Sequence, residues 1–313
     1  MQPTEPPGPL SLLGKNDDGR RFLTGALGEF RGTTATPPDR PPFLVTREHR
    51  RFAEFADTVR RHWYIGVCWG PPGVGKTLSA RQYAGTDDWE QWQRVLASSK
   101  ISGPGPVPAT LLSARSALWT PTVTATAKEI DQALPRACQQ ISWAVNYHVH
   151  GHVDPLMHPE SAASGLTELL IVDEADRLKT TGLEQVRDYY DRHHMGVILI
   201  GMPGIEKRLA RYPQLYSRIG FAHEYRPLNP DELNAVLTRR WNTDSLAVSA
   251  GRAPDDDLAR TVAIATIARI TGGNFRLIDR LLAQIHRIQQ LNNLATVTPE
   301  VVEAAREALL IGI

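Results

Sequence analysis

The residues with the clearest chemical meaning form a glycine-rich loop that ends in a lysine and a threonine. The segment Gly70-Pro-Pro-Gly-Val-Gly-Lys76-Thr77 matches the pattern G-x-x-x-x-G-K-[ST] in full. Glycines let successive backbone N–H groups turn inward around phosphate oxygens. Lys76 would add a mobile positive charge near the β- and γ-phosphates, and the Thr77 hydroxyl can ligate Mg²⁺. The pattern predicts a site for ATP and Mg²⁺ made by Gly70, Pro71, Pro72, Gly73, Val74, Gly75, Lys76, Thr77 and Leu78.

Two carboxylates follow a run of four apolar residues about one hundred positions later in the chain. Leu169–Val172 is predicted as a buried strand, and Asp173 and Glu174 come directly after it, where open α/β sheets bind ligands. Asp173 can hold Mg²⁺, and Glu174 can polarise a water for attack on the γ-phosphate. An exposed acidic turn is the alternative. Together with the glycine loop, the pair predicts ATP hydrolysis rather than a small-molecule kinase, which would need a substrate site instead.

A parallel sheet is needed to position these two motifs. Strands are predicted at 64–69, 109–113, 169–172, 197–200 and 221–225. Helices are predicted at 46–62 with Thr46 as N-cap, 77–84, 124–146 with a break or kink at Pro135, 183–192 and 205–212. Residues 86–108 are polar and rich in Gly and Pro, which is typical of a loop or hairpin. The alternation of strands and helices indicates an α/β fold with helices on both faces of the sheet.

The two ends of the chain differ from this α/β segment. Residues 1–42 are rich in proline and lack apolar periodicity, which predicts a disordered arm. From residue 231 onward only helices are predicted, at 231–241, 255–271, 274–291 and 298–309, and 274–291 has the clearest apolar stripe. The predicted domains are the Pro-rich arm (1–42), an α/β ATPase core (43–228) and an α-helical lid (229–313).

The composition is that of an ordinary globular protein, with 42% hydrophobic and 22% charged residues among 313. The apolar runs are strand-sized and the N-terminus lacks a signal-peptide pattern, so we predict a cytoplasmic protein without membrane association. A net charge of +1 does not indicate nucleic-acid binding, although a local basic surface would suffice. Cys68 and Cys138 are expected to be reduced thiols.

A histidine-rich segment raises the question of a metal site. His148, His150, His152 and His158 lie close together in the chain. The Gly and Pro residues among them oppose a helix that would gather ligands on one face, and no cysteine is near. A polar loop is therefore the favoured interpretation.

Several runs together resemble a known family. Leu169–Leu178 (LLIVDEADRL), Val186-Arg-Asp188, Val197–Met202 (VILIGM) and Tyr216-Ser-Arg218 resemble the AAA+ regulators of transposition TnsC and TniB, with MuB and IstB as more distant relatives. The similarity covers roughly residues 43–290 and is most specific within 168–240. It implies a P-loop AAA+ core with a five-stranded parallel sheet flanked by helices, and a small C-terminal helical lid.

The resemblance implies that Arg218 acts across a subunit boundary. In AAA+ proteins this position projects toward the nucleotide of the neighbouring subunit, and an arginine can contact two phosphate oxygens at once. A surface salt bridge is the alternative, and Arg208, Arg211 and Arg226 compete for the role.

Two further positions follow from the same comparison. Arg276, at the start of the 274–291 helix, is expected to reach the γ-phosphate of its own subunit. A helix-capping Asn274 beside an ordinary exposed arginine is the alternative. AAA+ proteins usually place a polar residue at the end of the fourth strand to orient the attacking water. This chain has Gly201-Met202 there, whose side chains cannot donate a hydrogen bond, so the role is unassigned.

The family likeness also implies partners. It implies an ATP-dependent homo-oligomer, ring or filament, that binds double-stranded DNA without strong sequence preference and recruits or activates a transposase, with a target-selecting protein as a further candidate partner. Lys128 resembles a DNA-facing lysine of these relatives, and Arg115 and Arg136 are additional candidates. Solvated helix charges are the alternative.

Two other functions stay open. A replication-initiator or helicase-loader-like AAA+ protein would share every ATP motif, but such proteins usually carry a winged-helix domain, and residues 231–313 are short for both that and a lid. A signalling ATPase would bind protein instead of DNA.

Overall fold

The computed structural model of this protein describes residues 13–15, 21–23, 43–98, 105–150, 165–243, 254–294 and 296–309. The chain divides into two units, residues 1–43 and 44–313. In the first unit, β1 (Leu13–Lys15) pairs antiparallel with β2 (Arg21–Leu23). The rest of the predicted arm lies outside the described residues, so its disorder stays a prediction.

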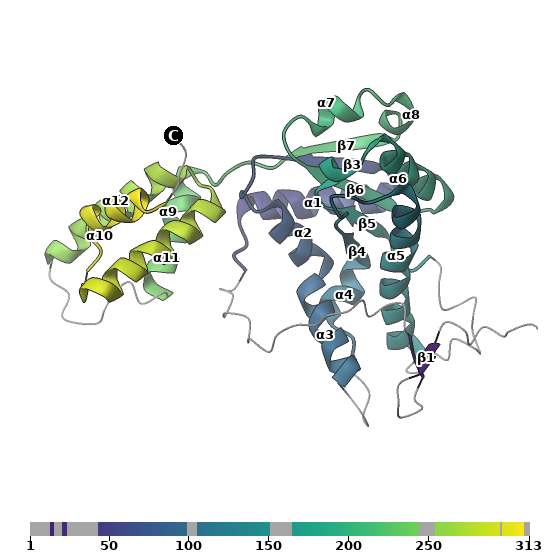
Figure 1. Cartoon of the computed structure of the whole chain (residues 1–313), viewed down its shortest axis with the longest axis horizontal. Helices are drawn as coiled ribbons and strands as arrows, with labels where there is room; N and C mark the ends of the chain where they lie inside the picture. The colour runs from purple at the N-terminus through teal and green to yellow at the C-terminus, as the bar shows by residue number, and fades with distance from the viewer. Residues whose placement is uncertain are drawn as a thin grey trace, which may run out of the picture. The chain divides into compact units, whose positions relative to one another are not determined.

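The second unit contains a five-stranded parallel sheet with the strand order β4-β5-β6-β3-β7 (Figure 1). The strands are β3 (Ile65–Trp69), β4 (Ser116–Trp119), β5 (Leu169–Val172), β6 (Gly196–Gly201) and β7 (Ile219–Glu224). Because β3 and β5 flank β6 in parallel, the segments that follow these two strands emerge at the same edge of the sheet. The predicted five-stranded parallel sheet with flanking helices is confirmed.

Alternate residues of the central strands pack into two different apolar cores, because successive side chains of a strand point to opposite faces. Val67, Leu170, Val172, Val197 and Leu199 share one core with helices α5 and α6. Cys68, Leu169, Ile171, Ile198 and Ile200 share the other with α1 and α2. These helices are α1 (Arg47–His62), α2 (Lys76–Ala84), α5 (Ala127–His150) and α6 (Thr180–Arg192), and Figure 1 shows α5 and α6 together beside the sheet.

The region between α2 and β4 differs from the prediction. Residues 86–98 form helix α3 (Thr86–Ser98) instead of a loop, because Trp89 and Trp92 fall on one side of a helix, stack with ring centroids 5.5 Å apart and are buried. The predicted strand at 109–113 is also wrong. These residues form α4 (Ala109–Ala114), which ends at Arg115 in the left-handed conformation, and the strand is β4, directly after it.

Most predicted helices are confirmed, with shifted ends in some cases. Thr46 caps α1, since its Oγ1 accepts a hydrogen bond from the backbone N of His49 at 3.1 Å. Helix α5 continues through Pro135, so a break there is wrong, and a kink at Pro135 stays a prediction. After β6 the chain forms α7 (Ile205–Leu209) and α8 (Pro213–Tyr216) in place of one helix.

The C-terminal part contains four helices around a core of their own. They are α9 (Pro230–Thr243), α10 (Pro254–Thr271), α11 (Phe275–Asn292) and α12 (Pro299–Glu307). Ile278, Leu281, Leu282 and Ile285 of α11 are buried in this core, as the apolar stripe predicts. The described residues include no helix long and apolar enough to span a membrane. The boundary between core and lid at residue 228 stays a prediction.

Candidate active site

The glycine loop has the backbone conformation that its sequence predicts. It lies between β3 and α2, with Gly73 at φ 79° and Gly75 at φ 108°, both in the region that favours glycine. Gly75 is the N-cap of α2, so the loop leads directly into the positive end of a helix. Val74 is buried and anchors the loop, whereas Leu78 is 48% exposed.

Lys76 lies inside this loop with its side chain largely buried. Its Nζ donates to the backbone oxygens of Gly70 at 2.5 Å and Pro71 at 2.8 Å. Burial lowers the pKa of Lys76, while the carboxylates of Asp173 and Asp176 act in the opposite direction. The ammonium group is therefore held at the loop by carbonyl dipoles and by the acids that follow β5.

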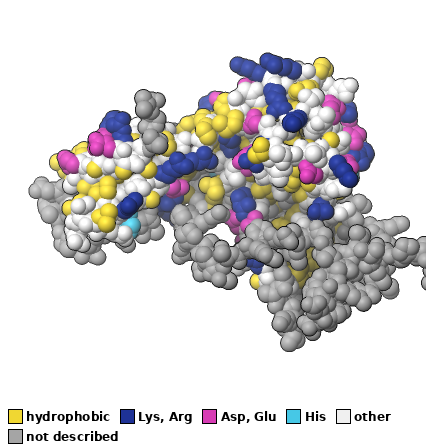
Figure 2. All heavy atoms as spheres, viewed as in Figure 1, with side chains coloured by type: hydrophobic (Ala, Val, Ile, Leu, Met, Phe, Trp, Pro, Cys, Tyr) yellow, Lys and Arg dark blue, Asp and Glu magenta, His cyan; other side chains and the backbone are white. Residues whose placement is uncertain are grey.

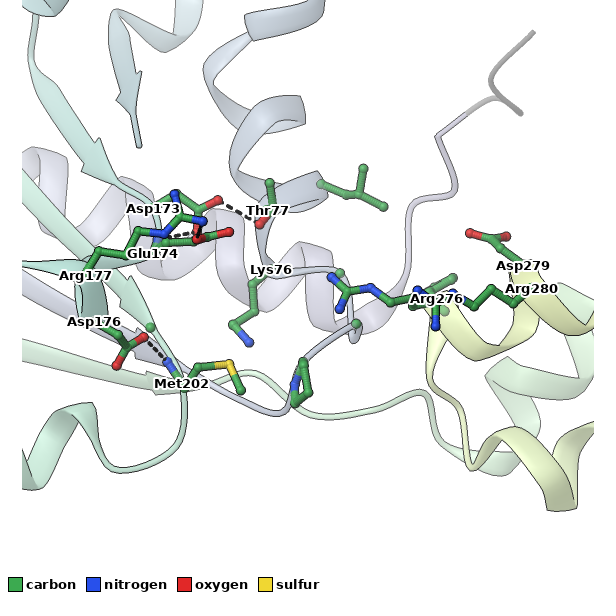
Figure 3. Close-up of a pocket in the computed structure, with 16 residues that line it drawn as sticks. Lys76, Thr77, Asp173, Glu174, Asp176, Arg177, Met202, Arg276, Asp279 and Arg280 are labelled. Atoms are coloured by element: carbon green, nitrogen blue, oxygen red, sulfur yellow. Dashed lines mark hydrogen bonds and ion pairs between the residues drawn. The ribbon is translucent and has the colours of Figure 1, made fainter. Parts of the chain in front are cut away.

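The structure brings the two predicted motifs into direct contact (Figure 3). The hydroxyl of Thr77 donates to Asp173 Oδ2 at 2.7 Å, and the backbone N of Glu174 donates to Asp173 Oδ1 at 2.9 Å. Asp173 is 3% exposed. A hydroxyl and a carboxylate side by side are the hard oxygen ligands that Mg²⁺ takes from proteins when phosphates and waters complete its shell. The donor set therefore fits the predicted magnesium.

Glu174 stands at the mouth of the pocket in an unusual backbone conformation. Its φ of 51° and ψ of 43° are left-handed, which is uncommon for a residue with a side chain. Its carboxylate forms an ion pair with Arg177. Arg177 also donates from Nη1 to the backbone oxygen of Pro121 at 2.9 Å. Glu174 is thus tied to the loop that precedes α5.

These residues line a cavity of about 510 Å³. Its wall consists of Pro72, Gly73, Gly75, Lys76, Thr77, Leu78, Asp173, Glu174, Asp176, Arg177, Gly201, Met202, Phe275, Arg276, Asp279 and Arg280. Four of these are acidic and four are basic. A triphosphate would therefore enter a pocket whose formal side-chain charges cancel.

The start of the lid contacts the glycine loop directly. The side-chain Nδ2 of Asn274 donates to the backbone oxygen of Pro72 at 2.8 Å, and the backbone N of Arg276 donates to that of Gly73 at 3.2 Å. The side chain of Asn274 also caps α11 by accepting from the backbone N of Leu277. Arg276 lines the cavity, and its contact with the γ-phosphate stays a prediction.

Arg218 does not line this cavity. Its Nε donates to Asp191 Oδ1 at 2.5 Å and its Nη2 to Asp191 Oδ2 at 2.8 Å, within the same chain. The hydrogen bond from Arg218 is the main reason that the pKa of Asp191 lies below its ordinary value. Among the other arginines considered for the contact with a neighbouring subunit, Arg208 donates to the backbone oxygens of Asp176 and Leu178. Its guanidinium is therefore engaged within its own chain.

The three candidate DNA contacts do not form one cluster. Lys128 and Arg136 are exposed on α5, two helical turns apart. Arg115 precedes β4, at the opposite end of that strand from the loop that leads to Lys128, and it pairs with Glu168 at 3.0 Å. Their role in DNA binding stays a prediction.

The cysteine and histidine predictions are only partly covered. Cys68 and Cys138 are free and buried. His148 and His150 belong to the last turn of α5, whereas His152 and His158 lie outside the described residues. Among the residues that are described, no group of three or more His, Cys, Asp or Glu is placed to hold a metal ion.

Sequence reasoning missed five residues of the site and its surroundings. Asp176 and Arg177 lie in the DEADRL run. Because they are only three and four residues after Asp173, their nearness in the sequence could have placed them at the site. Asn274 was considered only as a helix cap, and Arg280 lies one helical turn beyond Arg276. No signal pointed to Asp191, since its contact with Arg218 joins two elements through the fold.

The comparisons with known proteins agree with this geometry. A family model described as an AAA domain matches residues 59–209. A potential ATP-binding protein of Staphylococcus aureus is 41% identical over 280 residues, which cover 87% of this chain and 97% of the relative. The chain belongs to the AAA-domain ATPases. A narrower assignment to the regulators of transposition does not follow from these matches.

Three solved structures illustrate the likeness in fold. A mutant of Thermotoga maritima RuvB has a TM-score of 0.52 at 15% identity, covering 86% of this chain and 72% of that chain. The ADP form of Aeropyrum pernix ORC2 has a TM-score of 0.51 at 15% identity, covering 85% and 70%. Pyrobaculum aerophilum Cdc6p has a TM-score of 0.53 at 17% identity, covering 89% and 71%. At these identities the likeness concerns the fold.

Proposed function

We propose that this AAA-domain ATPase hydrolyses Mg-ATP as a switch for its own assembly on DNA. The observation that carries the hydrolytic part is the 2.7 Å contact of Thr77 Oγ1 with Asp173 Oδ2, beside Glu174 and the glycine loop. Thr77 and Asp173 would hold Mg²⁺, which neutralises phosphate charge when it is bound. Glu174 would accept a hydrogen bond from the attacking water.

Two variants test the hydrolytic site. Lys76→Ala removes the cation buried in the loop and should abolish ATP binding, which can be measured by titration with a fluorescent ATP analogue. Glu174→Gln leaves Lys76, Thr77 and Asp173 in place, so it should bind ATP and hydrolyse it at least about 10²-fold more slowly. Near-normal nucleotide affinity of Lys76→Ala would show that this loop is not the site.

We also propose that two subunits share each site through Arg218. The surface around Arg218 supports an oligomer, because Trp63, Tyr64 and Tyr216 are all about half exposed there. The backbone N of Ile65, which follows Tyr64, donates to the backbone oxygen of Arg218, so these aromatic residues and the arginine belong to one area of the chain.

A mixing experiment tests the shared site. Glu174→Gln subunits retain Arg218, and Arg218→Ala subunits retain Glu174, so a mixed interface can join one intact half from each. ATPase activity of the mixture above that of either variant alone is expected. If mixing restores nothing while both variants fold and associate, Arg218 is not the trans residue. Arg211 is then the next candidate, because it is exposed on the segment between α7 and α8, where Figure 2 shows basic side chains.

The DNA-binding part of the proposal rests on the resemblance of the LLIVDEADRL and VILIGM runs to the regulators of transposition, and on exposed basic residues without a base-reading motif. Phosphate contacts release counterions, so duplex binding should require ATP, be insensitive to sequence and weaken with salt. Lys128→Ala should weaken binding to every sequence to a similar degree. Arg115→Ala and Arg136→Ala test the two further candidates in the same assay.

The proposed partner on DNA is a transposase. A transposase encoded beside this protein should bind the ATP-loaded complex on DNA and not the Lys76→Ala variant. Tight binding to one DNA sequence, unchanged by salt, would contradict the DNA proposal. Absence of any duplex binding with ATP would favour the signalling alternative, in which the partner is a protein.

A further inference from the structure

The end of β6 lacks a polar side chain at the point where it reaches the ATP pocket. Gly201 and Met202 line the cavity, but Gly201 has no side chain and Met202 offers only a thioether sulfur, which is a weak acceptor and cannot donate. A water held by Glu174 alone is free to rotate about that one contact. Hydrolysis depends on the orientation of the attacking oxygen, so a second fixed partner for the water would matter.

The carboxylate of Asp176 occupies the place beside this strand end. The backbone N of Met202 donates to Asp176 Oδ2 at 2.6 Å (Figure 3). A Cβ on Gly201 would lie 2.7 Å from the same Oδ2 and 2.5 Å from Ile205 Cδ1. The absence of a side chain at position 201 therefore leaves room for an acid from a neighbouring segment of the chain.

Asp176 is held from a second side as well. Arg208 Nη1 donates to the backbone oxygen of Asp176 at 2.9 Å, and Arg208 also donates to the backbone oxygen of Leu178. The backbone and the side chain of Asp176 are thus fixed by separate contacts. A half-buried acid that is held in this way is positioned before any substrate binds, which is the condition for efficient orientation.

The chemistry of a carboxylate limits what Asp176 can do there. An ionised carboxylate only accepts hydrogen bonds, so it cannot donate to the γ-phosphate as an amide or hydroxyl would. Its Oδ2 already accepts from Met202, whereas its Oδ1 accepts no hydrogen bond from the described residues, and Asp176 lines the cavity. A water has two hydrogens to donate, and Glu174 needs only one of them.

We propose that Asp176 is a catalytic residue that accepts a hydrogen bond from the attacking water and takes the place of the polar side chain missing at Gly201-Met202. The proposal rests on the proposed ATP hydrolysis. The water oxygen forms a bond to the γ-phosphorus while the bond between that phosphorus and the β–γ bridging oxygen breaks, and ADP leaves with the electron pair. Glu174 receives the proton, and Asp176 orients the water without gaining one.

The test uses Asp176→Asn in the full-length protein. The amide oxygen can still accept from Met202, which turns the NH₂ group toward the cavity and removes the second acceptor for the water. Single-turnover hydrolysis of bound ATP should slow by about 10²-fold. The affinity for an ATP analogue should stay within about twofold or improve, because one negative charge near the phosphates is lost.

The matched control is Asp188→Asn, an acid of α6 that pairs with Arg192 at 2.8 Å and does not line the cavity. It should hydrolyse ATP like the wild type. Gly201→Ala gives an independent arm, because its Cβ must displace the Asp176 carboxylate, and it should also slow hydrolysis. Thermal unfolding of each variant verifies that it is folded.

Two results would overturn the inference. Asp176→Asn with wild-type hydrolysis, beside a slow Asp176→Ala, would reduce Asp176 to a structural contact for Met202. Loss of ATP binding in Asp176→Asn would make it a nucleotide-binding residue instead. Failure of the proposed function has a different signature, since the wild type would then lack hydrolysis, or Lys76→Ala would retain ATP binding.

Discussion

Asp191 competes with the neighbouring subunit for Arg218 if Arg218 acts in trans. In the single chain, the guanidinium of Arg218 makes two hydrogen bonds to Asp191, at 2.5 and 2.8 Å. A guanidinium committed to this carboxylate cannot contact two phosphate oxygens of another subunit at the same time. Assembly would therefore require Arg218 to leave Asp191, and we predict that Asp191→Asn eases assembly.

The size of the effect follows from the exposure of the pair. The side chains of Arg218 and Asp191 are 31% and 29% exposed, so water screens the pair substantially. Ion pairs near the surface contribute about 0.2 to 1 kcal/mol. Because about 1.4 kcal/mol corresponds to a tenfold change in an equilibrium constant, the variant should assemble about 1.4- to 5-fold more tightly. Asp191 also accepts a hydrogen bond from Arg187 at 2.7 Å. In Asp191→Asn the amide oxygen can still accept from Arg187, so this contact is retained in part.

The assay is ATPase activity as a function of protein concentration. A shared site makes activity rise as subunits associate, so the concentration for half-maximal activity reports the interface. Asp191→Asn should lower this concentration by about 1.4- to 5-fold and leave the maximal rate unchanged. Asp188→Asn removes an acid of the same helix that does not contact Arg218 and should behave like the wild type. A lower maximal rate in Asp191→Asn would mean that Asp191 supports Arg218 in the assembled state, which would refute the competition.

Three further predictions concern the pocket and its supports. Thr77→Ala should leave the fold intact but make ATP binding insensitive to added Mg²⁺, measured by titration with and without the metal, because Asp173 loses its neighbouring oxygen ligand. Asn274→Asp retains the cap of α11 and loses the donor to Pro72, so it should weaken ATP affinity without lowering thermal stability, whereas Asn274→Ala should also cost about 1 kcal/mol of stability. Burial lowers the pKa of His223, so below about pH 6.5 the unfolded state binds a proton that the folded state does not. The free energy of unfolding therefore decreases as the pH is lowered, by up to about 1.4 kcal/mol per pH unit. His223→Gln should make this decrease smaller, as measured by urea unfolding at several pH values.

Local sequence patterns were sufficient to predict the elements that form the ATP site. The glycine loop, the strand at Leu169–Val172 and the cap at Thr46 could be predicted because each depends on residues that are close in sequence. The apolar stripe of α11 was also sufficient, since its period is that of a helix.

The secondary structure of the segment from Thr86 to Trp119 was predicted wrongly, and the reason is physical. Ala109–Ser113 is a short apolar run, and periodicity cannot distinguish a helix from a strand over so few residues. In α3 the helical signal lies in two tryptophans among polar residues, and α5 contributes Trp143 and Tyr147 against Trp92. The partner that stabilises the element is thus about fifty residues away.

Contacts between distant parts of the chain were beyond sequence reasoning for the same reason. Asn274 and Pro72 are 202 positions apart, and Met202 and Asp176 are 26 apart. Nothing in the sequence near one residue of such a pair indicates which distant residue it will contact. Met202 and Asp176 meet because β6 lies beside β5 in the sheet, whereas Asn274 meets Pro72 because the start of α11 packs on the glycine loop.

The segment from Asp173 to Leu178 connects the ATP pocket to several other elements. Asp173 contacts Thr77 of α2, Asp176 contacts Met202 after β6, and Arg177 joins Glu174 to the backbone of Pro121 before α5. The proposed DNA contact Lys128 lies in the first turn of that helix. A displacement of the loop at Pro121 would move Arg177, which is the ion-pair partner of Glu174. Because coupling between two sites is reciprocal, the same contacts that would let DNA change the state of Glu174 would let the bound nucleotide change the affinity for DNA. The Arg177 contacts thus give the proposed switch a physical path of two residues rather than a rearrangement of the whole fold.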